Sequence, residues 1–350
     1  MLGTRFDTMG GISSVVNVYR TAGLFDRWPV KYIPTHCDGT TLDKFAIAIS
    51  AFIRFIVLAI KGNVGIVHIH VSSRASFWRK FGFFVFARIV GAKTIVHLHS
   101  GRFHIFYEKE CGVFAKRLIR YVFDKADRVI VLSHGWRSWL QSISANDSIL
   151  AIYNPVAVPS LDGFEKRDRN NVLSLGRLGK AKGSYDLVDA VAGLIQDFPV
   201  LQVTLAGDGD VTGILNHAQF RRVMGHVCAP GWITGAAKES LLQAASIYCL
   251  PSYNEGLPMS VLEAMAYGIP VISTPVGGIP EAITDGIEGY LVAPGDRVAL
   301  EAKLRLLLAD HRIAQKLGAD ARVKVEKNFS VEAVLPKIES IYRELGVMAR

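Results

Sequence analysis

Short runs of β-branched residues alternate with longer helix-forming stretches along the chain. VGIVHIH at 64–70, TIVHLH at 94–99 and DRVIVLS at 127–133 are such runs in the first half. NVLSLG, LQVTLAG, SIYCLPS, IPVIST and GYLVAP continue the pattern in the second half. Alternation of this kind is typical of βαβ units around a parallel sheet. The sequence therefore predicts an α/β fold.

The length of 350 residues is more than one hydrophobic core usually serves. A stretch rich in Pro, Asp and Asn, NPVAVPSLDGFEKRDRNN, follows Tyr153 and separates the two sets of runs. We therefore expect two doubly wound domains, residues 1–160 and 161–330. The final stretch, 331–350, carries an amphipathic helical pattern, and we expect it to return to the first domain.

The chain has the features of a cytoplasmic protein. Its start, MLGTRFDTMGG, lacks the charged region and apolar stretch of a signal peptide. The apolar run Phe45–Ile60 has 16 residues and contains Arg54, whereas a bilayer-spanning helix needs roughly 20 apolar residues. The cysteines form no CxxC pair, so we expect reduced core residues. They are Cys37, Cys111, Cys228 and Cys249.

All of the net positive charge lies in the first half of the chain. Residues 1–155 hold 20 Lys and Arg against 9 Asp and Glu, a net of +11, and the remainder holds 20 against 22, a net of −2. This asymmetry indicates a polyanionic partner, which could be an anionic membrane, nucleic acid or a phosphorylated substrate. Scattered, solvated charge is the alternative.

Two segments of the basic half mix aromatic and basic residues. FWRKFGFFVFARIV at 77–90 places aromatic rings beside Arg79, Lys80 and Arg88, and KRLIRYVF at 116–123 repeats the mixture. Most of the apolar residues are expected in the core. Exposed rings beside basic residues would also suit a peripheral contact with anionic lipid, with Arg79 and Lys80 at the interface.

Two glycine-containing loops are candidate phosphate sites, because ligands of open α/β sheets bind beyond the carboxyl ends of strands. Gly10 and Gly11 precede a helix expected to begin near Ser13, so their N–H groups could approach a phosphate. A tight turn is the alternative there. GRLGKAKG at 176–183 presents Arg177 and Lys182, which suit a diphosphate leaving group, with a solvated basic loop as the alternative.

A third candidate follows the run SIYCLPS. Glu255 lies in the loop, Pro258 stands where a first helical turn is expected, and Glu263 lies eight positions after Glu255. Backbone N–H groups at Gly256 and Leu257 could meet phosphate oxygens, and the two carboxylates could accept hydrogen bonds from sugar or ribose hydroxyls.

The segment AGDGD at 206–210 has a different character. Its glycines are spaced G-x-G-x-x-x-G and no acidic partner follows at the usual distance, so a nicotinamide enzyme is not expected.

Taken in order, these motifs resemble the retaining glycosyltransferases of family 4, also called group 1, with their E-x7-E signature. The resemblance runs nearly the whole length, from the glycine pair through YNPV, GRL, AGDGD and E-x7-E to GG-x-PE. It implies the GT-B fold, two facing Rossmann-like domains with an interdomain cleft. The first domain would serve the acceptor and the second would bind the nucleotide sugar.

The resemblance also implies roles for individual residues. Arg177 and Lys182 would bind the donor diphosphate, Glu255 would contact the donor sugar, and Glu263 would contact the ribose. Gly10, Gly11, Gly256 and Leu257 complete the expected donor-binding set, with Glu255 and one histidine as the expected catalytic residues.

The family places that histidine at the end of a strand in the first domain. His97 and His99 point to the same face, and His99 lies nearer the carboxyl end, so His99 is the candidate. The pairs His68/His70 and His97/His99 raise the alternative of a metal site. We expect none, because the resemblance implies metal-independent chemistry and no carboxylate accompanies either pair.

Two features depart from the family pattern. Only Met1, Leu2 and Gly3 precede the first loop, so the first strand is expected to be clipped. Ser100 follows His99 where many relatives carry Asp or Gly, which puts the acceptor side in doubt.

The expected function is that of a retaining, metal-independent hexosyltransferase that uses a nucleotide diphosphate sugar and no cofactor. Its acceptor would be a carbohydrate or a lipid-linked glycan of bacterial-type surface polysaccharide synthesis, and no nucleic-acid partner is expected. A sugar-nucleotide epimerase of GT-B-like fold is one alternative and would act without an acceptor. A basic membrane or nucleic-acid binding scaffold is another and would tolerate loss of Glu255.

Overall fold

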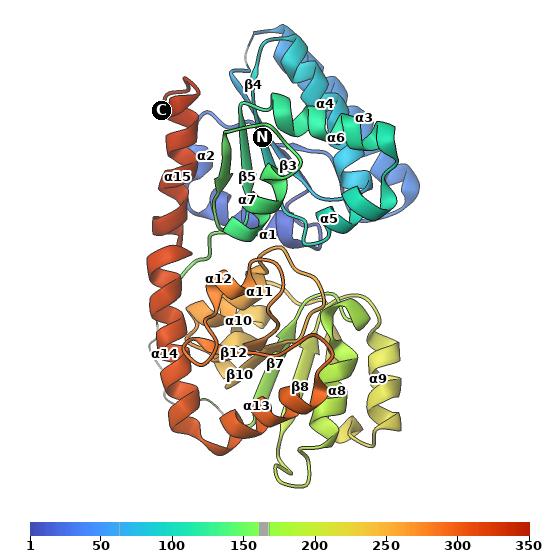
Figure 1. Cartoon of the computed structure of the whole chain (residues 1–350), viewed down its shortest axis with the longest axis vertical. Helices are drawn as coiled ribbons and strands as arrows, with labels where there is room; N and C mark the ends of the chain where they lie inside the picture. Colours follow the sequence, from blue (N-terminus) through green and yellow to red (C-terminus); the bar gives the residue numbers. More distant parts are fainter. Residues whose placement is uncertain (63, 161–166, 168) are drawn as a thin grey trace. The chain divides into compact units, whose positions relative to one another are not determined.

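The computed structural model describes residues 1–62, 64–160, 167 and 169–350. The chain divides into two compact units, one formed by Met1–Pro155 with Val331–Arg350 and the other by Val156–Ser330 (Figure 1). The division falls between Pro155 and Val156, ahead of the expected junction at 160/161. Each unit contains a six-stranded parallel sheet, so the α/β prediction with two doubly wound sheets is confirmed.

The sheet of the first unit has the strand order β2-β1-β3-β4-β5-β6. β3, β4 and β5 coincide with the predicted runs, whereas β1, β2 and β6 are only two or three residues long. The expected short first strand is present as the two-residue β1, which pairs with both β2 and β3. The strands are β1 (Leu2–Gly3), β2 (Ile33–Pro34), β3 (Ile66–Val71), β4 (Lys93–Leu98), β5 (Arg128–Val131) and β6 (Ile149–Ala151).

Helices cover this sheet and bury large aromatic side chains against it, among them Phe55, Phe77 and Phe123. α3 begins at a capping box in which Thr40 and Asp43 satisfy each other's backbone N–H groups. The helical segments are α1 (Gly11–Thr21), α2 (Leu24–Arg27), α3 (Thr41–Ile60), α4 (Ala75–Ile89), α5 (Phe103–Ile105), the π-helical Phe106–Glu110, α6 (Val113–Lys125), α7 (His134–Gln141) and α15 (Val331–Glu344).

The C-terminal helix α15 is part of the first unit. Its Tyr342 hydroxyl lies 2.8 Å from His68 Nδ1, and its Glu339 Oε1 accepts a hydrogen bond from Arg27 at 2.8 Å. Residues from the two ends of the chain thus meet in one core.

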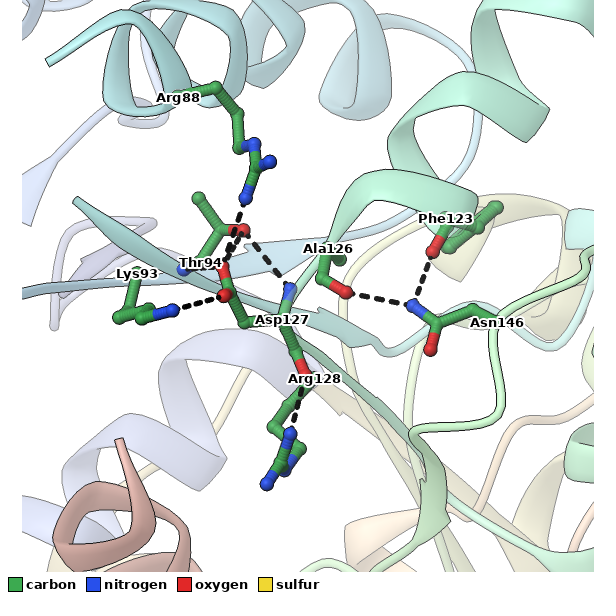
Figure 2. Close-up of polar contacts among 8 residues, drawn as sticks. All are labelled: Arg88, Lys93, Thr94, Phe123, Ala126, Asp127, Arg128 and Asn146. Atoms are coloured by element: carbon green, nitrogen blue, oxygen red, sulfur yellow. Dashed lines mark hydrogen bonds and ion pairs between the residues drawn. The ribbon is translucent and has the colours of Figure 1, made fainter. Parts of the chain in front are cut away.

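Asp127 ties α4 to the start of β4 and β5 (Figure 2). Its carboxylate accepts hydrogen bonds from the Thr94 N–H at 2.9 Å, Lys93 Nζ at 3.0 Å and Arg88 Nη1 at 3.2 Å. Burial opposes ionisation of Asp127, but the hydrogen bonds from Thr94 and Lys93 outweigh it and lower the pKa of Asp127. Nearby, the Asn146 amide donates to the Phe123 and Ala126 carbonyl oxygens.

The sheet of the second unit has the strand order β12-β11-β10-β7-β8-β9. All five predicted runs form strands, and β9, which no run predicted, lies at an edge with several exposed residues. The strands are β7 (Asn171–Leu175), β8 (Gln202–Ala206), β9 (Val227–Gly231), β10 (Ile247–Leu250), β11 (Val271–Ser273) and β12 (Gly289–Leu291). The helices are the 3-10 turn Lys180–Lys182, α8 (Ser184–Ala192), α9 (Val211–Phe220), the 3-10 turn Met224–His226, α10 (Gly235–Ala244), α11 (Met259–Ala266), α12 (Ile279–Ala282), α13 (Arg297–Ala309) and α14 (His311–Asn328).

Each sheet has one point where the strand order reverses. In the first unit the chain continues from β2 back across β1 to β3, and in the second it continues from the edge strand β9 back to β10 beside β7. Ligands of doubly wound folds bind at the carboxyl ends of the strands that flank this point. In the second unit those strands are β7 and β10.

Two expectations about side-chain burial are wrong. Lys80 is only 1% exposed and Arg79 is half-buried, because α4 turns this part of its surface toward the core. Lys80 therefore cannot belong to the basic surface expected of it. Of the cysteines, Cys37 and Cys249 are buried, but Cys228 is exposed and therefore not a core residue. Among the described residues, no helix is long and apolar enough to cross a bilayer.

Candidate functional site

Lys182 and Glu255 form a partly buried ion pair between the loops that follow β7 and β10. Lys182 Nζ donates to Glu255 Oε1 at 2.5 Å, and Ser252 Oγ donates to the same oxygen at 2.8 Å. The Tyr253 N–H also donates to the Ala181 carbonyl oxygen at 3.0 Å, so the two loops are joined by their backbones. Glu255 is 7% exposed, and a carboxylate this buried requires such partners.

Glycines allow these loops to approach so closely. A Cβ atom at Gly183, where φ is 68°, would collide with the carbonyl oxygen of Pro251. A Cβ at Gly277, where φ is 59°, would collide with the carbonyl oxygen of Glu255. The Gly278 N–H donates to the Gly256 carbonyl oxygen at 2.5 Å. Both positions therefore need glycine to hold the Glu255 loop in place.

Arg177 extends from the same loop as Lys182 but into solvent. Its side chain is 76% exposed, and its Nε atom lies 3.9 Å from Asp208 Oδ2. The loop itself is fixed, because the Leu178 N–H donates to the Asp208 carbonyl at 2.6 Å and the Asp210 N–H donates to the Leu178 carbonyl at 3.1 Å. Within the described part of the chain, no hydrogen bond or ion pair joins Arg177 to Lys182 or Glu255. Its guanidinium is accessible to an anionic ligand.

Glu263 lies on α11, where Lys238 Nζ of α10 donates to its Oε1 at 2.7 Å. Its side chain is mostly buried. Pro258 is the residue that caps α11 rather than part of its first turn. Gly256 and Leu257 are buried immediately before this helix.

Ser252 and Lys238 were not predicted from the sequence. Ser252 could have been noticed, because it lies three residues before Glu255 in the same loop. Lys238 gives no such signal, since a lysine on a helix resembles any solvated surface residue. Both act on a predicted glutamate, one on Glu255 and the other on Glu263.

The glycine pair of the first unit follows β1. Gly10 has a φ of 147° and caps α1, which begins at Gly11 rather than near Ser13. A Cβ atom at either glycine would meet open space. The Ser13 hydroxyl donates to the Gly10 carbonyl oxygen at 2.7 Å and fixes the turn. The N-terminal end of α1 is therefore open to a ligand, but the structure gives no direct sign of one.

Four histidines form a stack across β3 and the end of β4, which we call the histidine ladder. It consists of His68, His70, His97 and His99. His70 is paired with His97 in the sheet, and His99 follows β4 directly. His68 Nε2 lies 3.2 Å from His97 Nδ1, and His70 Nδ1 lies 2.8 Å from His99 Nε2. His99 is half-buried at the carboxyl end of the strand, while the other three are fully buried.

The ladder is uncharged at neutral pH. Burial lowers the pKa of His97 to about 3, and burial together with the neighbouring rings lowers the pKa of His68, His70 and His99 well below the ordinary value. A neutral imidazole has one donor and one acceptor nitrogen. The hydrogen bond to His70 therefore orients the His99 ring and couples its tautomer to that of His70.

Ring nitrogens of His68, His70 and His97 all lie within 4.8 Å of one another, which is close enough for a shared metal ion. An imidazole binds a metal in the plane of its ring, along the nitrogen lone pair. The ring planes are nearly parallel, at 14° between His68 and His70 and 18° between His68 and His97. Two of the ring contacts bring nitrogens to hydrogen-bond distance, which requires a proton on one nitrogen of each pair, so the observed geometry is that of a hydrogen-bonded stack.

Residues 162–324 match the family model for glycosyl transferases, group 1. This range covers nearly all of the second unit, including both loops of the Lys182–Glu255 pair. The second unit belongs to the group 1 glycosyltransferases. The family that its motifs resemble is therefore confirmed.

A curated relative matches part of this chain. D-inositol 3-phosphate glycosyltransferase from Corynebacterium diphtheriae is 32% identical over 181 residues, which is 50% of this chain and 42% of that protein. The chain spans about half the length of the first curated relatives that it matches.

Solved structures match nearly the whole chain. Sucrose-phosphate synthase from Thermosynechococcus elongatus has a TM-score of 0.79 at 22% identity, covering 96% of this chain and 94% of that one. Anabaena HepE in complex with UDP-glucose has a TM-score of 0.72 at 17% identity, covering 93% and 89%. These likenesses concern the fold, and they identify the two Rossmann-like units as the GT-B architecture.

Proposed function

We propose that this glycosyltransferase moves a sugar from a nucleotide diphosphate sugar to a carbohydrate or lipid-linked acceptor, with retention at the anomeric carbon and without a metal ion. The observation that carries the proposal is the Lys182–Glu255 pair beside the reversal point of the second sheet. The pair places a cation, which can bind a diphosphate, beside a carboxylate, which can accept hydrogen bonds from the hydroxyl groups of the attached sugar. A solved structural neighbour, HepE, was crystallised with UDP-glucose, which supports a donor of this class.

The two basic residues would stabilise the leaving diphosphate. An ammonium group has three N–H donors, so Lys182 can keep its bond to Glu255 and still donate to phosphate oxygens. Arg177 offers a planar fork of donors from an exposed position. Fixed positive charge of this kind lowers the energy of negative charge that develops as the glycosidic bond breaks. It can take the place that a cation holds in other transferases.

The two glutamates would recognise hydroxyl groups of the donor. Ser252 and Lys182 both bind Oε1 of Glu255, and the second carboxylate oxygen can accept a hydrogen bond from a sugar hydroxyl. Lys238 orients Glu263, whose expected partner is the ribose. Each glutamate is therefore held ready before a ligand binds, which lowers the entropy lost on binding.

His99 would serve the reacting sugar from the first unit. It is neutral, half-buried at a strand end and held by His70, so it can donate or accept one hydrogen bond at a fixed position. No protein nucleophile is assigned in this proposal. The acceptor would attack the oxocarbenium-like carbon from the face that the diphosphate leaves, which gives retention.

The test is nucleotide release from UDP-, GDP- and ADP-sugars, with and without glycan and lipid-linked acceptors. We expect release that depends on acceptor, persists in EDTA and yields a product with the donor's anomeric configuration by NMR. Conversion of the donor sugar without acceptor would support an epimerase instead. Absence of nucleotide release from every donor would support a non-enzymatic scaffold, and surface polysaccharide synthesis would then lose its basis.

A further inference from the structure

One face of α3 exposes a continuous row of large apolar side chains. They recur at intervals of three or four residues, which places them on one side of the helix. Each is between 45% and 80% exposed. We call this row the α3 stripe, and it consists of Leu42, Phe45, Ile49, Ile53, Val57 and Ile60.

The opposite face of α3 already fills the core. Ala51, Phe55 and Ala59 are buried, and Phe52 and Phe55 contact Phe83 of α4 at ring distances of 5.0 and 5.5 Å. Figure 1 shows the two helices side by side. α3 is therefore apolar on both faces, although only one face is covered by protein. An apolar surface of this length on a soluble unit marks a contact site.

α4 extends the apolar surface at one end. α3 connects β2 to β3 and α4 connects β3 to β4. Because β2, β3 and β4 belong to one parallel sheet, both connecting helices run opposite to the strands and therefore parallel to each other. Their C-terminal ends therefore lie together. Ile89, at the end of α4, is 73% exposed, close in this arrangement to the end of the stripe at Ile60.

The charge around the stripe has one sign. Between Asp43 and Glu108 the chain has nine Lys and Arg and no Asp or Glu. Some of these cations are used inside the unit, since Arg74 pairs with Glu110 and Arg88 pairs with Asp127. The nine are Lys44, Arg54, Lys61, Arg74, Arg79, Lys80, Arg88, Lys93 and Arg102.

Two of the remaining cations border the stripe. Arg54 and Lys61 each follow a stripe residue, Ile53 and Ile60, and so lie about 100° around the helix from it. Both are exposed, and no ion pair in the described ranges includes either one. An apolar row with a line of cations along its edge is the pattern of a helix that lies in the interface of a membrane. A second copy of the chain fits less well, because symmetric pairing of α3 would bring like charges together.

We propose that the α3 stripe docks the first unit on an anionic lipid surface, with the stripe among the headgroups and Arg54 and Lys61 against lipid phosphates. This assigns the contact to α3 in place of the segment that contains the half-buried Arg79 and the buried Lys80. The helix lies on the bilayer and does not cross it, in agreement with its charged residues Asp43, Lys44 and Arg54. The proposal is independent of the transfer reaction, because it needs no donor or acceptor.

The test is sedimentation of the full chain with vesicles of phosphatidylcholine alone or mixed with phosphatidylglycerol, without nucleotide sugar. We expect binding to the mixed vesicles and little to the neutral ones. Ile49→Asp/Ile53→Asp and Arg54→Glu/Lys61→Glu should each reduce the bound fraction at least about tenfold, since each basic residue near an anionic leaflet contributes about fivefold in affinity.

Matched controls come from exposed residues elsewhere. Val298→Asp/Val323→Asp makes the same polar change in the second unit, and Lys327→Glu/Lys337→Glu makes the same change in charge. Both should bind like the wild type, with melting temperatures recorded for every variant. Equal binding of the wild type to both vesicle types, or none to either, would overturn the proposal. So would a stripe variant that keeps lipid binding while light scattering shows that it has lost a dimer, because a second copy would then cover α3.

Discussion

Lys182 Nζ lies 2.5 Å from Glu255 Oε1, although 73 residues separate the two in the chain. The contact exists because β7 and β10 are neighbours in the sheet, so the loops that follow them leave from the same edge. A cation and a carboxylate are thereby fixed beside the point where a doubly wound sheet binds its ligand. The proposed transfer chemistry depends on this pair more than on any other contact in the second unit.

Glu255→Gln should preserve the fold and lose most of the transfer activity. The amide keeps the shape and still accepts from Ser252, but it lacks the charge that strengthens hydrogen bonds from sugar hydroxyls. We expect a ten- to thousandfold loss of kcat/KM in nucleotide-release assays. Glu239→Gln, an exposed change on α10, is the control and should leave turnover unaltered. Near-normal turnover in folded Glu255→Gln would remove Glu255 from the site.

The two basic residues of the GRLGKAKG loop should differ in their effect on stability. Lys182→Ala leaves the buried Glu255 carboxylate without its cation, so it should weaken donor binding and also reduce the free energy of unfolding by about 1–3 kcal/mol. Arg177→Ala should weaken donor binding with little change in melting temperature, because Arg177 is largely exposed. Calorimetric binding of nucleoside diphosphate and thermal melts measure the two effects. Lys180→Ala, in the same turn, is the control, and unchanged affinity in both test variants would exclude the diphosphate role.

The long runs were predictable from sequence for a physical reason. Central strands such as β4 and β10 are buried on both faces, so they appear as continuous apolar runs. β9 was missed because exposed residues interrupt its pattern, and β1, β2 and β6 because they are too short to show one. The strand-end motifs placed Arg177 and Glu255 correctly in their loops, because a short sequence motif determines the conformation of the few residues around it.

The partners of those residues were harder to predict, because they come from other elements. Nothing in the segment around Lys238 indicates that its ammonium group reaches Glu263. Lys80 is a different case, since a signal was present. Phe77, Lys80 and Phe84 are spaced as one helical face, so the face that buries the two phenylalanines also buries the lysine. The mixture of basic and aromatic residues in this segment, considered without their helical spacing, predicts a surface position for this lysine.

The histidine ladder should make the first unit sensitive to acid. Its pKa values are lowered in the folded chain, so below about pH 6.5 the unfolded chain binds protons that the folded chain does not. Stability is complete above pH 6.5 and falls as the pH drops toward 3, by about 1.4 kcal/mol per pH unit for each histidine. Urea unfolding at pH 7, 6 and 5 measures this slope.

Substitution of one ladder histidine tests whether the ladder causes this dependence of the free energy of unfolding on pH. His97→Gln keeps a polar side chain but removes one titrating ring, so the decline between pH 6.5 and 5 should become shallower by about 1.4 kcal/mol per pH unit. His104→Gln, outside the ladder, is the matched control. Parallel slopes in the His97 variant and the wild type would contradict the neutral ladder.

Lys80→Met should stabilise the first unit at neutral pH. Burial lowers the pKa of Lys80 from 10.5 to about 7, and among the described residues its ammonium group donates to the Ser76 hydroxyl alone, at 3.2 Å. Between pH 7 and 10.5 the unfolded chain holds a proton that the folded chain lacks, so stability is lost as the pH falls through this range and stays low below it. Methionine fills a similar volume without a charge, and the expected gain at pH 7 is on the order of 2–5 kcal/mol. The gain should fade as the pH approaches 10.5.

Denaturant unfolding at pH 7 and 10 measures the gain in the free energy of unfolding at each pH, with the exposed Lys61→Met as the control for loss of charge. An equal gain at the two pH values would show that improved packing, and not the buried charge, is the cause.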